Sequence, residues 1–376
     1  MKKLYHIYIK LFTFIFILTG CSGLPVSSDI TTVDIKPQLE NSVTLYASDI
    51  ISEMRYIALE TTNSSLLSST GNIIIQQNGY FLMRDRNSLY MFDSNGKYIH
   101  QISKQGQGAE EYVNINNFDA DNDNIYIYDG PRRRILVYSY DNKYLKTIKQ
   151  QSNNITNVTH IHKLPEGFLC YQEPAMLYKK YKEAVPDLIL FDENGNEKKI
   201  LHYRTLNIDG SFPFMYGVPI PCFKKHNGRI FIYLPLQDTI FSVNGENLNP
   251  EIVINRGEHA VYPESMDSKD KRRIVDEKGV IVNKFTLNDK YLILCCEYRK
   301  QNVTFVYDFE TKELKNVSKI INDFDNTYDI FTFDLTNNQM LDRKHAFEII
   351  EEDRIPESVK NLKEDDNPVI RISTLK

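Results

Sequence analysis

Short apolar runs that alternate with polar residues recur along most of this chain, and turn-forming residues separate them. The runs at 80–83 and 89–92 are followed by an Asp-Ser-Asn-Gly turn at 93–96 and then by a run at 98–102. A turn of this kind between two alternating runs is typical of a β-hairpin, because a type I′ turn needs positive φ at both central residues. The pattern predicts antiparallel strands, and helical periodicity is scarce.

The same strand-and-turn unit is repeated along the chain. Its copies span 72–102, 125–148, 168–201, 230–254 and 291–317. A spacing of roughly 45 to 65 residues indicates the blades of a β-propeller, since one small sheet cannot bury its own two faces. We therefore expect an all-β fold, a six-bladed β-propeller of four-stranded antiparallel blades that occupies residues 42–376, with seven blades as the alternative.

The sixth blade is expected to be shared between the two ends of the chain. Strands at 56–59 and 369–375 would pair and close the ring, which removes an exposed sheet edge. A further strand is expected at 331–335 and a helix at 356–363. The charged stretch 264–278 interrupts the pattern and indicates either a helix or a disordered insert.

Residues 1–20 have the features of a bacterial lipoprotein signal peptide. Lys2 and Lys3 make the N-terminus positive, and the eight-residue, mostly apolar run Leu11–Leu18 is too short to cross a bilayer core of about 30 Å. The sequence Leu18-Thr19-Gly20-Cys21 resembles the lipobox, and this resemblance implies cleavage before Cys21 and lipidation there. Several acyl chains together hold a protein stably on a membrane. The alternative is an ordinary secretory signal with a chance cysteine.

The segment after the cleavage site bears on location. Residues 21–41 are rich in Ser, Thr, Asp and Pro and are expected to form a flexible tether. Surface-exported lipoproteins tend to carry acids just after the cysteine, whereas Ser22–Ser28 contain none. We therefore expect a lipid-anchored protein of the cell envelope, on the outer membrane and facing the periplasm, with the cell surface as the alternative.

Charge and cysteine content exclude several classes of protein. Removal of the signal peptide takes away three lysines and moves the net charge from −5 to −8, which disfavours nucleic acid as a partner. No cysteines form a CxxC pair, so neither a zinc site nor a thioredoxin-like site is indicated. Cys295 and Cys296 are expected to fill the core, and a disulfide between Cys170 and Cys222 is left open.

Four segments in order give the chain a resemblance to a known family. They are Tyr56–Thr61, Gly106-Gln107-Gly108 with Glu111-Tyr112, Asp238–Phe241, and Lys363–Val369 with its Asp-Asp-Asn-Pro sequence. With these the chain resembles the six-bladed β-propeller lipoproteins of Bacteroides-type bacteria, which are relatives of the NHL-type propellers and mostly of unknown function. The absence of tryptophan argues against WD40 repeats. The resemblance implies a fold and a location, and little chemistry.

Two groups of residues are candidate sites. His160 and His162 stand two apart in an expected innermost strand, so they share one face and would line the central channel. Without a third ligand they are a weak metal-site candidate. Arg132, Arg133 and Arg134 follow a turn and suit an acidic glycan or another anion at the mouth of the propeller, because guanidinium groups pair well with carboxylates and phosphates. The competing interpretation is an exposed basic turn.

Two motif-like segments are better explained as structure. Gly106-Gln107-Gly108 lacks the following helix that a phosphate-binding loop needs, so a turn between blades is favoured. Asp119, Asp121 and Asp123 open like a calcium loop, but the later glycine and glutamate of an EF-hand are missing. A solvated turn is therefore expected there.

The sequence favours a binding or scaffolding function over catalysis. No Ser-His-Asp order or paired carboxylate stands out, and no cofactor is predicted. A glycan, a peptide and an envelope protein are all open as ligands. The alternative is a metal-dependent lyase or lactonase-type hydrolase in the propeller channel, which needs several acidic, Asn or His side chains converging from different blades.

Overall fold

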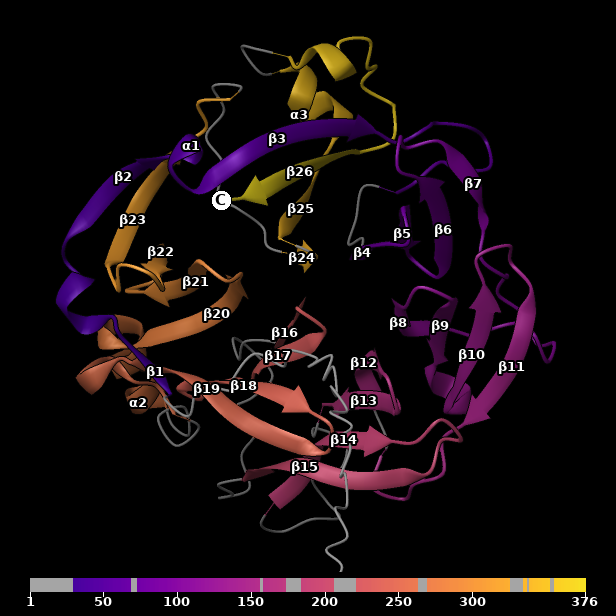
Figure 1. The fold of residues 1–376 in the computed structure, drawn as a ribbon, viewed down its shortest axis with the longest axis horizontal. Coiled ribbons are helices and arrows are strands. Elements are labelled where there is room, and N and C mark those ends of the chain that lie inside the picture. Colours follow the sequence, from indigo (N-terminus) through magenta and orange to yellow (C-terminus); the bar gives the residue numbers. More distant parts are fainter. Residues whose placement is uncertain are drawn as a thin grey trace, which may run out of the picture.

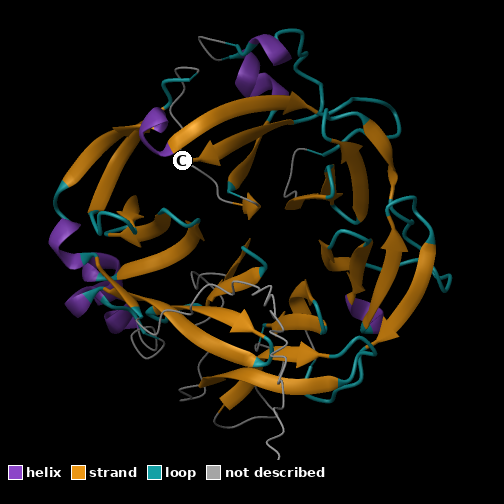
Figure 2. Cartoon of the chain, viewed as in Figure 1, coloured by secondary structure: helices purple, strands orange, loops and turns teal. Residues whose placement is uncertain are grey.

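The computed structural model describes residues 30–68, 73–155, 158–173, 184–205, 221–262, 269–324, 334–336, 338–351 and 355–376. Within them six antiparallel sheets stand around a common axis (Figure 1). The predicted six-bladed β-propeller is confirmed. Figure 2 shows that the few helices lie towards the periphery. None of the helices in the described ranges is long and apolar enough to cross a membrane.

Blades 1 to 3 follow one another along the chain, and each runs from its innermost to its outermost strand. Blade 1 comprises β4 (Ile73–Gln77), β5 (Tyr80–Asp85), β6 (Ser88–Asp93) and β7 (Tyr98–Gln101). Blade 2 comprises β8 (Ile115–Ala120), β9 (Asn124–Asp129), β10 (Arg134–Ser139) and β11 (Tyr144–Lys149). Blade 3 comprises β12 (Val158–Leu164), β13 (Gly167–Gln172), β14 (Ala184–Phe191) and β15 (Glu197–Thr205).

Blades 4 to 6 complete the ring. Blade 4 comprises β16 (Cys222–His226), β17 (Arg229–Tyr233), β18 (Thr239–Asn244) and β19 (Asn247–Asn255). Blade 5 comprises β20 (Val280–Leu287), β21 (Tyr291–Tyr298), β22 (Gln301–Asp308) and β23 (Leu314–Ile321). Blade 6 comprises β24 (Asp334–Thr336), β25 (Gln339–Lys344), β26 (Val369–Leu375) and β3 (Ile51–Ala58), so its outermost strand comes from the N-terminal part of the chain.

The core of the molecule lies between neighbouring blades. In β5, Phe81 and Met83 pack against blade 6, whereas Leu82, which points the other way, packs against blade 2. Successive side chains of a strand point to opposite faces of its sheet, and here both faces are buried. This explains why many strands read as nearly continuous apolar runs.

The ring is closed as predicted, by antiparallel pairing of β26 with β3. Val369 is opposite Ala58 in this pairing. Asn367, which is buried, reinforces the closure: its Oδ1 accepts from Leu67 N at 2.9 Å, and its Nδ2 donates to the carbonyls of Glu60 and Ser65, both at 2.8 Å. The expected closure motifs around Glu60 and Asn367 are therefore in direct contact.

Residues 30–41 correct one prediction, because this part of the expected flexible tether is built into the propeller. β1 (Thr31–Asp34) pairs in parallel with β19 of blade 4, and Val33 and Ile35 are buried. β2 (Ser42–Tyr46) pairs in parallel with β23 of blade 5 and leads through α1 (Ala47–Ile50) into β3. We call residues 30–46 the N-terminal strap. Val33, Ile35 and Leu39 pack against apolar side chains of blades 4 and 5, which is why the strap is not a tether.

Other local expectations have mixed outcomes. The helix expected at 356–363 is only a single 3-10 turn, Glu357–Val359, while α3 (Ala346–Ile350) was not foreseen. The charged stretch contains α2 (Lys269–Lys278), which agrees with the helical alternative. Cys170 and Cys222 are both buried and both free, so the disulfide left open above is not formed. Of the expected strand at 331–335, residues 331–333 lie outside the described ranges.

In blades 1, 2 and 3, the turn before the outermost strand is hydrogen-bonded to the end of the preceding blade. The turn between the third and fourth strands of blade 1 accepts a hydrogen bond at Gly96 O from Glu60 N, at 2.8 Å. In blade 3, Gly195 O accepts from Gln151 N at the same distance, and in blade 2 Asn142 makes a related contact. The Asn- and Gly-containing turns seen in the sequence therefore also join neighbouring blades.

Candidate functional site

The two predicted histidines lie near the propeller axis, on β12, the innermost strand of blade 3 (Figure 1). Both rings face Phe223 of the neighbouring blade, with ring centroids 5.2 Å from His160 and 4.6 Å from His162. Tyr171 adds a fourth ring, 6.0 Å from Phe223. We call these four residues the axial ring cluster. The shared face expected for His160 and His162 is confirmed.

The imidazoles of the axial ring cluster are held in the neutral state. Burial, with a smaller effect from the charge of Arg84, lowers the pKa of His160 to about 4. Burial together with the ammonium group of Lys225 lowers the pKa of His162 well below its ordinary value. The Nε2 atom of His162 is buried and has no hydrogen-bond partner among the residues that the structure describes.

Neutral imidazole is the form that ligates metals. Across the described ranges, however, no group of three or more His, Cys, Asp or Glu side chains is placed to hold a metal ion. Metal binding at His160 and His162 therefore stays a prediction. Metal analysis of the purified protein and of its His160→Ala variant tests it, and equal metal content in the two would contradict it.

Side chains of blade 2 hold the free edge of β12. Asn117 Oδ1 accepts from Ile161 N at 3.1 Å, and Asp119 Oδ2 accepts from Lys163 N at 2.6 Å. Lys225 of blade 4 reaches the same Asp119 carboxylate at 2.6 Å. Asp119 is thus a buried connection between three blades rather than part of a solvated turn. Only the Asp121 part of the expected turn is confirmed, since its carboxylate accepts from the amides of the residues that follow.

A charged network adjoins the axial ring cluster on blade 3. Arg204 donates to Tyr171 OH at 2.5 Å and lies 3.4 Å from the fully buried carboxylate of Asp187. The same carboxylate is 2.6 Å from His202 Nδ1. Burial raises the pKa of Glu173, which is 3.6 Å from Arg204. No spacing motif links these residues, so sequence reasoning missed them.

The three predicted arginines are close together in sequence but act separately. Arg132 donates to the carbonyls of Gly108 and Gln107 at 3.1 and 3.0 Å. Arg133 donates to the carbonyl of Ser152, in the connection between blades 2 and 3. Arg134 is buried and forms an ion pair with Asp129 at 3.0 Å. Binding of an acidic ligand here stays a prediction, but each guanidinium already donates to the chain itself.

Two of these arginines instead fix the connection between blades 1 and 2. Arg134 donates to the carbonyls of Ala109 and Glu111 at 3.0 and 2.6 Å. Glu111 in turn folds back and accepts from Gly108 N at 2.9 Å. A Cβ at Gly106 would stand 1.9 Å from this carboxylate, so a larger residue there would push the Glu111 side chain out of its present place. The predicted structural turn at Gly106-Gln107-Gly108 is confirmed.

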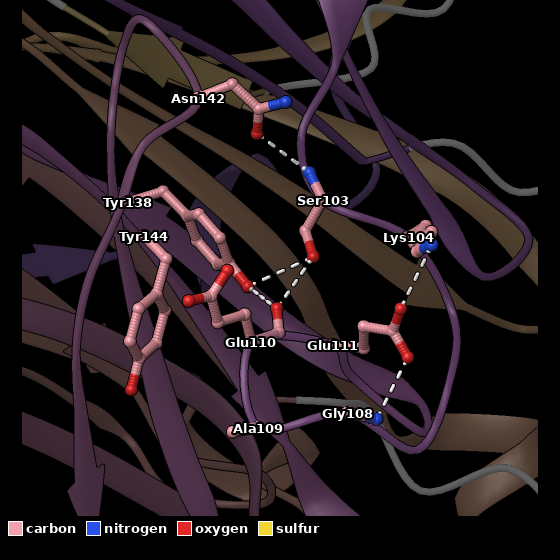
Figure 3. A pocket seen from close by; sticks show the side chains of 9 residues that line it. All are labelled: Ser103, Lys104, Gly108, Ala109, Glu110, Glu111, Tyr138, Asn142 and Tyr144. Atoms are coloured by element: carbon pink, nitrogen blue, oxygen red, sulfur yellow. Dashed lines mark hydrogen bonds and ion pairs between the residues drawn. The ribbon is translucent and has the colours of Figure 1, made fainter.

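A cavity of about 630 Å³ opens beside this connection, on the outer part of the junction between blades 1 and 2 (Figure 3). We call it the rim cavity. Its lining residues are Ser103, Lys104, Gly108, Ala109, Glu110, Glu111, Tyr138, Asn142 and Tyr144. Sequence reasoning missed it, because the wall combines a connecting loop with side chains from the following blade.

The wall of the rim cavity is held by internal hydrogen bonds. The Tyr138 hydroxyl donates to the Glu110 carbonyl and lies 3.0 Å from Ser103 Oγ, and burial raises its pKa to about 12. Asn142 Oδ1 accepts from Ser103 N at 2.9 Å. The rings of Tyr138 and Tyr144 are 6.0 Å apart and nearly perpendicular. The cavity is therefore pre-formed.

These features define the protein as a six-bladed β-propeller with a pre-formed cavity at its rim. The chain belongs to the family described as a domain of unknown function, DUF4934, which matches residues 30–374. This agrees with the propeller family inferred from the sequence, and the match begins at the N-terminal strap. No curated protein matches the chain.

Two crystal structures from Bacteroides share the fold. The first is an inferred exported protein of Bacteroides fragilis, 16% identical, which aligns over 92% of this chain and 100% of its own with a TM-score of 0.65. The second is a member of the DUF4221 family from Bacteroides vulgatus, 9% identical, which aligns over 87% of this chain and 97% of its own with a TM-score of 0.51. At such identities the likeness concerns the fold alone.

Proposed function

We propose that this protein is a lipid-anchored binding protein of the bacterial cell envelope, exported by its signal peptide and modified at Cys21. The lipobox-like sequence Leu18–Cys21 supports this, and the description of the Bacteroides fragilis neighbour as an inferred exported protein is consistent with it. Cys21→Ser should release the protein from the membrane fraction of fractionated cells. Continued membrane association of this variant would contradict lipidation.

The N-terminal strap limits how far the propeller can stand from its anchor. β1 begins at Thr31, only ten positions after Cys21. Ten residues span at most about 36 Å even when fully extended. The outer edge of blade 4, where β1 pairs with β19, therefore stays within this distance of the lipid anchor. An orientation on the periplasmic side of the outer membrane remains our proposal, and protease shaving of intact cells tests it.

The rim cavity is the observation that carries the binding function. It has the volume typical of a small-ligand site, and its wall is already ordered by Tyr138, Asn142 and Arg134. A pre-ordered wall lowers the entropy that binding has to overcome. In contrast to the axial ring cluster, the cavity also opens to solvent at the rim, where a glycan, a peptide or a partner protein can reach it.

The test is capture of ligands from envelope extract and on a glycan array with the protein from Ser22 onward. A Glu110→Ala/Tyr144→Ala variant should lose the captured ligand. A Glu364→Ala/Tyr203→Ala variant serves as the control, since it removes an exposed carboxylate and an exposed tyrosine elsewhere. Equal capture by both variants would place binding outside the rim cavity.

A further inference from the structure

Some charged side chains around the rim cavity form ion pairs, and one does not. Lys104 Nζ lies 3.1 Å from Glu111 Oε1, and the other Glu111 oxygen accepts from Gly108 N. At the cavity edge, Lys143 pairs with Asp141 at 2.8 Å. Glu110, by contrast, is exposed, and its carboxylate has no hydrogen-bond or ion-pair partner within the described ranges. One negative charge is thus left to act on a ligand.

Aromatic surface accompanies this carboxylate. Figure 3 shows the Glu110 side chain directed towards the rings of Tyr138 and Tyr144, with the Lys104–Glu111 pair on the other side of the cavity. Tyr138 is buried and forms part of the wall, whereas Tyr144 is only half-buried. Tyr144 can therefore offer a ring face to a ligand, and its hydroxyl is already 2.8 Å from Thr147 Oγ1.

We propose that the rim cavity binds an amino sugar, with the ammonium group of the sugar at Glu110 and the C–H face of its ring against Tyr144. This inference rests on the proposed binding function. A sugar ring is apolar on its faces and polar around its edge, which matches an aromatic platform with polar groups around it. A carboxylate forms charge-assisted hydrogen bonds with an ammonium group. A cation close to a tyrosine ring is further stabilised by the ring electrons.

Acidic sugars fit the same place poorly. The ammonium of Lys104 is already paired with Glu111, so the unpaired charge facing a ligand is that of Glu110. Like charges brought together without a counter-ion repel. The cavity therefore selects against the acidic glycans that the neighbouring arginines alone would suggest, because those arginines donate to the connecting loop instead.

The test is titration calorimetry with the glucosamine disaccharide of chitosan and with its N-acetylated counterpart, at mildly acidic pH where the amines are charged. The wild-type protein should bind the amine disaccharide about tenfold more tightly than the acetylated one, as expected for one charge-assisted hydrogen bond. Glu110→Gln and Tyr144→Ala should each weaken binding of the amine disaccharide about tenfold. Glu364→Gln and Tyr203→Ala should leave it unchanged.

The contrary outcomes separate this inference from the binding function itself. If the acetylated disaccharide binds as tightly as the amine, or Glu110→Gln binds unchanged, the ammonium preference is wrong while the cavity remains a binding site. If neither disaccharide binds, the amino-sugar inference is overturned. In that case capture from envelope extract by wild-type protein, and its loss in the Glu110→Ala/Tyr144→Ala variant, still decides whether the cavity binds another ligand.

Discussion

Gly195 occupies the turn between β14 and β15 and touches the end of the preceding blade. Its φ is +84°, and a Cβ there would lie 2.1 Å from the carbonyl oxygen of Lys149. Gly195→Ala should therefore lower the free energy of unfolding by about 3 kcal/mol, because backbone strain adds to the loss of the contact between blades.

Gly79 provides a matched control for this prediction. Its φ is +78°, but a Cβ there would have no heavy atom within 4 Å. Gly79→Ala should lower the free energy of unfolding by only about 1 kcal/mol, because backbone strain is the single cause there. Urea unfolding of both variants measures the difference. Equal losses would mean that the turn of blade 3 does not join it to blade 2.

The side chain of Asn367 makes three hydrogen bonds where the ring is closed. It is buried, and its amide pairs with three backbone groups on the approach to the first blade. Asn367→Ala should lower the free energy of unfolding by about 3 kcal/mol, since buried groups lose their partners. Asn95→Ala, at an exposed turn position, should change it by less than about 0.5 kcal/mol. A stability loss at Asn95 equal to that at Asn367 would contradict this role.

His160 makes stability depend on pH. Its pKa is lowered from 6.5 to about 4 in the folded chain. Between these values the unfolded chain binds a proton that the folded chain does not, so stability is complete above pH 6.5 and falls as the pH drops towards 4. The neutral His160 contributes at most about 3 kcal/mol to the free energy of unfolding. His160→Gln should show a shallower fall in urea unfolding over this range, and an unchanged fall would show that His160 is protonated while folded.

At the scale of the elements, the N-terminal strap packs on blades 4 and 5 and is expected to stabilise the propeller. Ile35 is fully buried next to blades 4 and 5. Ile35→Ala should lower the free energy of unfolding by about 3 kcal/mol, as for other buried large-to-small changes. Val43→Ala, at an exposed position of β2, should change it by less than about 0.5 kcal/mol. A neutral Ile35→Ala would mean that the strap behaves as a tether.

The elements that could be predicted from the sequence are the apolar strands flanked by clear turns, which include the middle strands of the blades and several outermost strands such as β7 and β11. The innermost strands β8 and β16 were missed, because they carry polar side chains that bind neighbouring blades. Asn117 and Asp119 accept hydrogen bonds from the edge of β12, and Lys225 forms an ion pair with Asp119. Such strands lack the alternation that marks a hairpin. The strap was missed for a similar reason, since two buried residues, Val33 and Ile35, form too short a pattern to stand out.

The candidate sites show the same limit. The shared face of His160 and His162 could be predicted, because it depends only on a spacing of two within a strand. The rim cavity could not, because Glu110 belongs to a connecting loop while Tyr138 and Tyr144 belong to the next blade. Their proximity follows from the docking of one blade on another, which no local pattern records.

At the scale of the whole molecule, the blades of the propeller differ in the strands that form their outer edges. Blades 4 and 5 each gain a fifth strand from the strap, and blade 6 takes β3 as its outermost strand. Blades 1, 2 and 3 end in β7, β11 and β15. The rim cavity lies among these latter blades, away from the strap and from the proposed anchor. The proposed binding site is thus presented on a part of the rim that the anchor does not cover.

The central claim is that ligands bind in the rim cavity, and site-specific photo-crosslinking tests it most directly. A photo-reactive amino acid at Ala109, which is exposed and lines the rim cavity, should capture an envelope component. The same group at Tyr203, an exposed position on the outermost strand of blade 3, should not capture it. Capture of the same component from both positions, or from Tyr203 alone, would contradict the claim.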